Sequence, residues 1–299
     1  MPMVETRAVV AGLILTFAGV ACSDSTGVDA AANRKILFIG QSDPTFGLAT
    51  IYAIQSNGNG LVKLTSGLGQ AFYPRWSRDG SQIAYSTGAS TAAQVWVMNA
   101  NGTNAHAISD PNYSCAAYIR LTWSPTGDRI LADCELLEQF VINVAARTSY
   151  SLTQQWGDVA GTPDWSPVAD KILYLRSSDA QVANLDGTGA VTVAAAAFQP
   201  QWSPDGTLIT FARRNEVHTT VIFVANADGS NAHQITFPAD ATVADGPASW
   251  SPDGKHIVYV RAESSVGFYG TSRLHVIDPN GANDVTISPD TLWALRPDW

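Results

Sequence analysis

The chain has 299 residues and a net charge of −9; 45% of its residues are hydrophobic and only 14% are charged, which is typical of one or two globular domains. Its 17 lysine and arginine residues are not clustered, which argues against binding to nucleic acid, where basic side chains must displace counterions from phosphates. The same shortage argues against direct adsorption to anionic lipid.

Residues 1–21 are predicted to be a signal peptide. Arg7 precedes an uncharged run that ends at Cys22, and this run is too short to span a bilayer but suits a secretory segment. A cysteine directly after small residues resembles the lipobox of bacterial lipoproteins, although a lipobox usually carries an aliphatic residue at the place of Gly19. The resemblance implies that Cys22 is lipidated and becomes the mature N-terminus. Ordinary secretion with an incidental cysteine is the alternative.

Residues 22–33 are predicted to be a flexible tether, because they have no apolar periodicity and no aromatic residue. Ser23 directly after Cys22 favours the outer membrane in those bacteria that sort lipoproteins by this residue. We therefore expect an exported protein that is held in the bacterial cell envelope, on the periplasmic or outer-membrane side, by a lipid alone.

The rest of the chain, residues 34–299, repeats a phrase of the form Trp-Ser-Pro-Asp-Gly followed by an apolar strand. The tryptophans of these copies are Trp76, Trp123, Trp165, Trp202 and Trp250. Periods of about 40–50 residues with several strand-like runs each are typical of β-propeller blades. Each period divides into four short strands; the first ends at the tryptophan, and tight turns rich in Pro, Gly and Asn connect the others. The sequence therefore predicts an all-β fold of four-stranded antiparallel blades.

The two ends of the chain predict that the ring has six blades. Residues 295–299 match a first strand with no second strand after it, whereas residues 35–39 match a second strand with no first strand before it. One blade shared between the termini closes the ring without an open seam. Prolines two residues before a tryptophan indicate an edge strand facing the channel, because proline cannot donate to a β-ladder. These are Pro74, Pro163, Pro200 and Pro297. The tryptophans themselves are expected to pack between adjacent blades.

The phrase W-S-P-D-G-x-x-I-x-[YF], with N-x-[DN]-G-x-N-x-x-x-[IL]-[ST] after it, resembles the WD40-like (PD40) repeat of TolB-type propellers. The resemblance implies a six-bladed propeller that binds at one face. In TolB the propeller docks a peptidoglycan-associated lipoprotein, and a separate N-terminal domain contacts the rest of the Tol machinery. This chain has only the tether in place of that domain, so only the binding capacity carries over. Two blades, with Val168-Ala169 and Ala145-Ala146 in place of turn residues, are expected to be the least regular.

Cys115 and Cys134 are predicted to form a disulfide, because export places them in an oxidising compartment. They flank one hairpin centred near Thr126 and point to the same face. Such a turn pairs Cys134 with Tyr118, so Cys115 must fold back to reach its partner. Two free buried thiols are the alternative.

The sequence contains none of the common catalytic or metal-binding motifs. There is no G-x-S-x-G elbow, no H-E-x-x-H, no C-x-x-C and no phosphate-binding glycine loop. None of the five histidines falls on a predicted channel-lining strand, which favours surface roles over metal ligation. The run at residues 226–231 lacks the later glutamate of a calcium loop and is interpreted as a turn. We expect neither a metal nor a cofactor.

Candidate binding residues lie just before the tryptophans, at the predicted channel mouth: Arg75, Asp164, Gln201 and Asp298, with Arg120 slightly earlier. The leading hypothesis is a monomeric, non-enzymatic scaffold that binds an envelope protein or glycan. The alternative is a carbohydrate-active enzyme, a polysaccharide lyase or glycosidase, in which the carboxylates Asp164 and Asp298 would act as a pair. A structural lipoprotein with no ligand is a third hypothesis.

We predict that Cys22 carries the lipid anchor. Cys22→Ala should release the protein from the membrane fraction into the soluble fraction, because the remaining signal segment supplies no second anchor. Fractionation followed by immunoblotting measures this, with a fatty-acid probe to label the parent protein. An unlabelled parent, together with a variant that stays on the membrane, would contradict the prediction.

Overall fold

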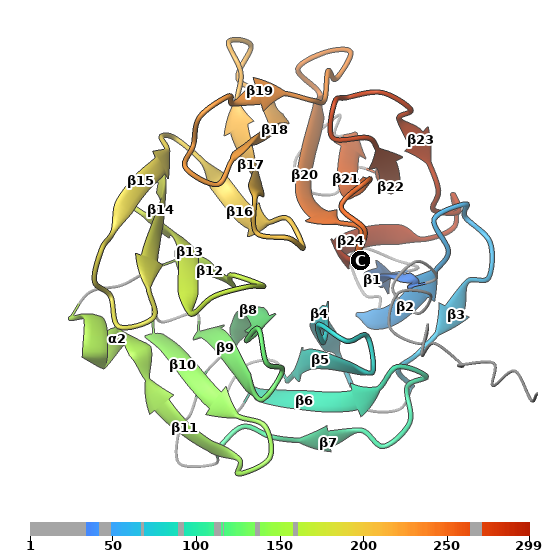
Figure 1. Cartoon of the computed structure of the whole chain (residues 1–299). Coiled ribbons are helices and arrows are strands. Elements are labelled where there is room, and N and C mark those ends of the chain that lie inside the picture. The colour runs from blue at the N-terminus through green and yellow to red at the C-terminus, as the bar shows by residue number, and fades with distance from the viewer. Residues whose placement is uncertain are drawn as a thin grey trace, which may run out of the picture.

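A computed structural model describes residues 34–41, 49–66, 69–88, 93–110, 115, 117–134, 138–157, 161–263 and 271–299. Six four-stranded antiparallel sheets stand around a central channel, as Figure 1 shows. The predicted six-bladed propeller is therefore confirmed. The predicted signal peptide, Cys22 and the tether lie outside the described residues, and no helix among the described residues is long and apolar enough to span a membrane.

Each blade is a meander that runs outward from the channel, and we number the blades from the shared one. Blade 1 contains β24 (Trp293–Asp298), β1 (Ile36–Gln41), β2 (Thr50–Ile54) and β3 (Val62–Lys63). Blade 2 contains β4 (Ala71–Trp76), β5 (Gln82–Thr87), β6 (Gln94–Asn99) and β7 (His106–Ala107). Blade 3 contains β8 (Tyr118–Trp123), β9 (Arg129–Cys134), β10 (Glu138–Asn143) and β11 (Thr148–Ser151).

The other three blades have the same order of strands. Blade 4 contains β12 (Gly161–Trp165), β13 (Lys171–Arg176), β14 (Asp179–Asn184) and β15 (Val191–Ala194). Blade 5 contains β16 (Phe198–Trp202), β17 (Leu208–Arg214), β18 (Thr220–Asn226) and β19 (His233–Gln234). Blade 6 contains β20 (Val243–Trp250), β21 (Ile257–Glu263), β22 (Thr271–Ile277) and β23 (Val285–Thr286).

Blade 1 joins the two ends of the chain, as the sequence predicted. The C-terminal strand β24 pairs antiparallel with β1, and Ala294 lies opposite Gly40 while Asp298 lies opposite Leu37. Strand β24 is the innermost strand of its sheet, so the shared blade has the same layout as the other five. The hydrogen bonds of this pair close the ring.

The repeat tryptophans fill the spaces between blades. Each of six hydrophobic clusters contains side chains from two adjacent blades and one repeat tryptophan. Trp123, for example, packs with Val97 of blade 2 and Ile130 of its own blade 3. Trp123 and Trp165 are almost completely buried, whereas Trp76 and Trp299 are half-buried. The repeated tryptophan is therefore a packing residue, as expected.

Each innermost strand has a β-bulge or irregular register against the second strand of its blade. In four blades the residue three before the tryptophan is a non-glycine residue with a left-handed φ of 46–52°, and a proline follows it. These residues are Tyr73, Thr162, Gln199 and Arg296. A bulge interrupts the alternation of side chains along a strand and re-aims those that follow. The residue just before each tryptophan thereby faces the channel.

The structure contains the predicted disulfide between Cys115 and Cys134. Tyr118 pairs with Cys134 on β9, as expected from the turn, and the backbone of Cys115 instead bridges to Ala93, just before β6. The bond therefore ties the margin of blade 2 to blade 3. Both blades that were expected to be the least regular keep four strands, and a short helix, α2 (Leu152–Trp156), follows β11 of blade 3.

Deleting residues 295–299 should prevent stable folding. The truncation removes most of β24 and the indole of Trp299, and it leaves β1 as a new exposed edge, which promotes aggregation. Full burial of a tryptophan contributes roughly 4–6 kcal/mol as an upper estimate, against the 5–15 kcal/mol of a typical domain. Trp299 is half-buried and contributes part of this, in addition to the hydrogen bonds of β24. Thermal melting and solubility measure the effect, and deletion of residues 23–29 is the control. A truncated protein that melts like the parent would show that the clasp is dispensable.

Candidate functional site

Six side chains that precede the repeat tryptophans form a ring in the channel. They are Arg75, Thr122, Asp164, Gln201, Ser249 and Asp298. Four of them were candidates from the sequence. Thr122 and Ser249 were missed because they are small and uncharged, although their place in the repeat identifies them equally well.

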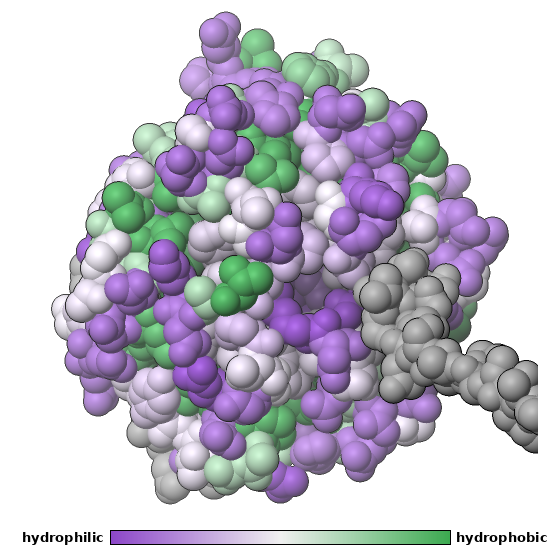
Figure 2. Space-filling model, in the orientation of Figure 1, coloured by the Kyte–Doolittle hydropathy of each residue, from purple (hydrophilic) through white to green (hydrophobic). Residues whose placement is uncertain are grey.

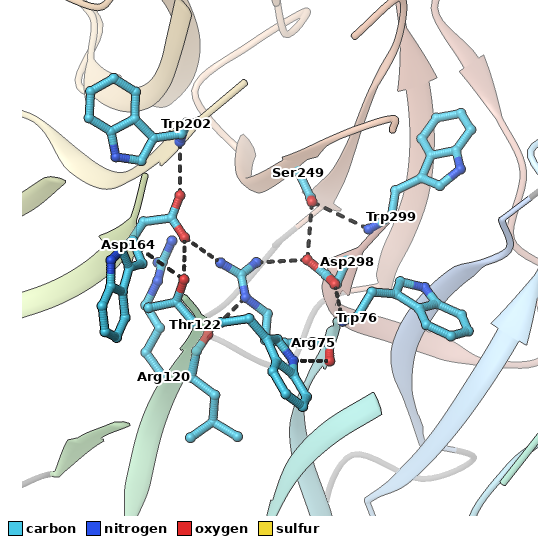
Figure 3. A network of polar contacts seen from close by, with 12 residues as sticks. Arg75, Trp76, Arg120, Thr122, Asp164, Trp202, Ser249, Asp298 and Trp299 are labelled. Atoms are coloured by element: carbon cyan, nitrogen blue, oxygen red, sulfur yellow. Dashed lines mark hydrogen bonds and ion pairs between the residues drawn. The ribbon is translucent and has the colours of Figure 1, made fainter. Parts of the chain in front are cut away.

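Arg75 lies at the centre of this ring and binds both of its carboxylates (Figure 3). Its Nη1 lies 2.8 Å from Asp298 Oδ1, its Nη2 lies 2.9 Å from Asp164 Oδ1, and its Nε donates to the carbonyl oxygen of Leu121 at 2.9 Å. Burial alone would lower the pKa of Arg75, but Asp298 and Asp164 outweigh burial and raise that pKa. The guanidinium therefore stays charged and holds blades 1, 2, 3 and 4 together.

A second contact recurs between neighbouring blades. The side chain before one tryptophan accepts a hydrogen bond from the backbone N–H of the tryptophan of the next blade. The four N···O distances are Trp76–Asp298 2.7 Å, Trp165–Thr122 3.0 Å, Trp202–Asp164 2.9 Å and Trp299–Ser249 3.3 Å. These side chains therefore satisfy donors that an innermost strand, being a sheet edge, would otherwise leave without a ladder partner.

Arg120, the fifth candidate from the sequence, does not line the cavity with the other four. It is buried, and it donates from Nη2 to the carbonyl oxygen of Pro200 at 3.1 Å. Burial lowers the pKa of Arg120 to about 10. It is not among the residues that line the channel mouth.

Asp133 is a buried carboxylate on β9 that sequence reasoning missed. Its Oδ1 accepts a hydrogen bond from Gln139 Nε2 at 3.0 Å, and its Oδ2 accepts one from the backbone N–H of Thr162 at 3.1 Å. It thereby fixes the bulge of β12 in the next blade. Burial, which outweighs these hydrogen bonds, raises the pKa of Asp133 to about 6.

The channel mouth, meaning the end of the channel at the Trp-Ser-Pro turns, contains a cavity of about 250 Å³. All six blades contribute to its lining, which includes the six ring residues and five of the repeat tryptophans. Arg34 and Arg78 also line it, and neither was a candidate from the sequence. The sequence could have identified Arg78 as unusual, because the other complete copies of the repeat have proline at this position.

No group of three or more potential metal ligands occurs among the described residues. The histidines make local contacts instead. His106 and His233 occupy equivalent positions, and each places Nδ1 near the carbonyl oxygen of the residue two before it. His256 Nδ1 lies 2.8 Å from Asp278 Oδ1, and His275 Nδ1 lies 2.9 Å from Asp284 Oδ1.

Comparison with known proteins identifies this fold. The chain superposes on TolB from Acinetobacter baumannii with a TM-score of 0.72 and 15% identity, over 89% of this chain and 66% of that one. It superposes on a putative TolB from Agrobacterium tumefaciens with a TM-score of 0.64 and 17% identity, over 85% of this chain and 88% of that one. The fold is therefore that of a TolB-like six-bladed propeller.

Sequence comparison adds little beyond the fold. No family model matches the chain. A segment of 91 residues is 32% identical to an uncharacterized peptidase, YuxL, of Bacillus subtilis. That segment is 30% of this chain and only 13% of the peptidase, so the two proteins share a small part of their length.

Asp133 should make stability depend on pH. The folded-state pKa of Asp133, about 6, lies above the ordinary value of about 3.9. The contribution of Asp133 to the free energy of unfolding is therefore fully retained below about pH 4 and is lost as the pH rises through about 6. Asp133→Asn removes this titration. From pH 4 to pH 7, the free energy of unfolding of the variant should therefore rise by roughly 2–3 kcal/mol relative to that of the parent. Urea denaturation across this range measures the difference, with the exposed Asp290→Asn as control. Parallel parent and Asp133→Asn curves would contradict the prediction.

Proposed function

We propose that this chain is a non-enzymatic lipoprotein of the bacterial cell envelope that binds a partner protein or glycan at the mouth of its propeller channel. The observation that carries the proposal is the cavity at this mouth. Ligand sites are usually concave and combine aromatic or apolar walls with a few convergent polar groups. Here all six blades supply such groups to one cavity. The TolB-like fold and the predicted export signal support a binding role in the envelope, and they favour a protein over a glycan as the partner.

The arrangement of the two carboxylates gives less support to the alternative, a lyase or glycosidase. A glycosidase needs one carboxyl group that is protonated and one that is free to act as nucleophile or base. Both Asp164 and Asp298 are instead bound to Arg75, and both oxygens of each carboxylate accept hydrogen bonds. The pair is thus better suited to holding blades together than to proton transfer.

Site-specific cross-linking tests the proposal. Val168 is 64% exposed beside the cavity, and Val191 is 61% exposed on the outer strand β15, so the two positions form a matched pair. A benzophenone amino acid placed at Val168 should yield a discrete cross-linked product in native envelope, and the same group at Val191 should not. Protease digestion of the product then distinguishes a protein partner from a glycan.

Two results would contradict the proposal. Identical products from both positions, or none from either, would show that the channel mouth is not a binding face. Release of new reducing or unsaturated ends when the mature protein is incubated with acidic polysaccharides would instead favour the enzyme. Loss of that release in Asp164→Asn would then place the reaction at the ring.

A further inference from the structure

The channel mouth departs from the internal repeat at two neighbouring turns. The third residue of the Trp-Ser-Pro phrase is proline in blades 3, 4, 5 and 6, but it is Arg78 in blade 2. The fourth residue of the phrase is aspartate in blades 2, 5 and 6, but it is Val168 in blade 4. Because blades 5 and 6 fold with proline and aspartate at these two positions, neither change is needed to form a blade. Arg78 lines the cavity, and Val168 follows Pro167, which also lines it.

Arg78 reaches across the channel. Its Nη2 donates to the carbonyl oxygen of Trp165 at 2.6 Å and lies 3.3 Å from that of Trp123. A second guanidinium, that of Arg34, lines the same cavity. Its Nη2 donates to the backbone carbonyl oxygen of Arg78 at 2.9 Å, and its Cζ lies 5.7 Å from the centre of the Trp76 ring. In the part of the chain that the structure describes, neither guanidinium forms an ion pair with a carboxylate. Desolvation by the surrounding protein lowers the pKa of both.

The charges at the cavity do not balance. Three guanidinium groups, those of Arg34, Arg75 and Arg78, line it together with only two carboxylates, Asp164 and Asp298. Arg75 already occupies one oxygen of each carboxylate. The cavity therefore holds an excess of positive charge in a chain whose net charge is −9. An anionic group on a ligand would supply the missing counter-charge.

Blades 4, 5 and 6 each add a proline to the cavity beside their polar ring residues. Pro167, Pro204 and Pro252 face the cavity there, with the indoles of Trp202 and Trp250 behind them. Figure 2 shows hydrophobic surface over the turn between β12 and β13 and hydrophilic surface over the turn between β4 and β5, with a hollow between them. Proline has no backbone N–H, so these three turn positions offer no such donor to a hydroxyl group. Against the prolines, a sugar acid would lose hydrogen bonds to water that the prolines do not replace.

We propose that this cavity binds a carboxylate next to an apolar side chain, as presented by the C-terminal residue of a partner polypeptide, with Arg34 and Arg78 contacting the carboxylate and the proline wall contacting the side chain. The inference rests on the proposed binding function and names its ligand chemistry. A volume of about 250 Å³ is below the range of roughly 300–1,000 Å³ that drug-sized ligands occupy, which fits a single residue. Arginine pairs and apolar pockets are common means of capturing such groups.

Small probes test the chemistry directly. N-acetyl-L-phenylalanine should bind to the mature protein in isothermal titration calorimetry, and N-acetyl-L-phenylalaninamide, which lacks only the charge, should bind at least about tenfold more weakly. Arg78→Pro and Val168→Asp restore the residues of the other blades, so both variants should fold. Each should weaken binding of the acid about tenfold or more, whereas the exposed Arg214→Gln should not. Circular dichroism melting checks that every variant is folded.

A hexapeptide ending in phenylalanine distinguishes a polypeptide terminus from a free acid. It should bind at least as well as the small probe, and its C-terminal amide should not bind. Equal binding of acid and amide, no binding of the acid at millimolar concentration, an unaffected Arg78→Pro variant, or exclusion of the hexapeptide would each overturn the inference. If the acid binds but cross-linking at Val168 yields no product, the pocket stands and the proposed function fails. If cross-linking at Val168 succeeds but N-acetyl-L-phenylalanine neither binds nor competes, the proposed function stands and the inferred carboxylate pocket fails.

Discussion

The structure depends on how the innermost strand of each blade satisfies its backbone. This strand is a sheet edge that faces the channel, and an edge leaves N–H groups without ladder partners. At four positions the partner is a side chain of the neighbouring blade, the one that precedes its tryptophan. Arg75 of blade 2 adds one ion pair to the adjacent blade 1 and one to blade 4, which is not adjacent to it. All of these contacts need blades in their final places. The ring therefore forms as one unit, and the interblade tryptophans pack only when it does.

The same constraint limits what the channel can do chemically. Residues that face a propeller channel are natural candidates for catalysis, but here Asp164 and Asp298 are occupied in holding blades together. The chemical character of the mouth comes also from turn positions at which the repeat varies. Arg78 is such a variation and lines the cavity, and Val168, another variation, is exposed next to the lining residue Pro167. A repeat protein can thus keep one set of residues for closure and acquire its binding surface from departures within the repeat.

Much of this architecture could be predicted from the sequence. The repeat predicts the blades, because the tryptophan, the proline two residues before it and the Gly turn after it each indicate a local feature. These features are a packing residue, an edge strand and a tight turn. The match between residues 35–39 and the second strands of other blades predicts the clasp. The expected oxidising compartment and the shared face of one hairpin together predict the Cys115–Cys134 bond. These inferences succeed because each depends on a single blade or on one hairpin.

The cavity could not be predicted in the same way. Arg34 and Arg78 are distant in sequence from the residues they meet, and only closure of the ring brings them together. Nor does a sequence show that Tyr73 or Gln199, as ordinary non-glycine residues, adopts a left-handed φ, because the bulge that requires it is set by the neighbouring strand. Asp133 was missed for a similar reason, since the donor that it meets lies in the next blade.

The shared blade also has a consequence for how the protein is made. Strand β1 pairs with β24, so the first strand of the ring cannot find its partner until the last residues of the chain have been synthesised. Such a contact between chain ends raises the contact order and slows folding, although the entropy of closing so long a loop grows only slowly with its length. The six blades can therefore form their own hairpins early, but the ring stays unclosed until β24 is available to pair with β1.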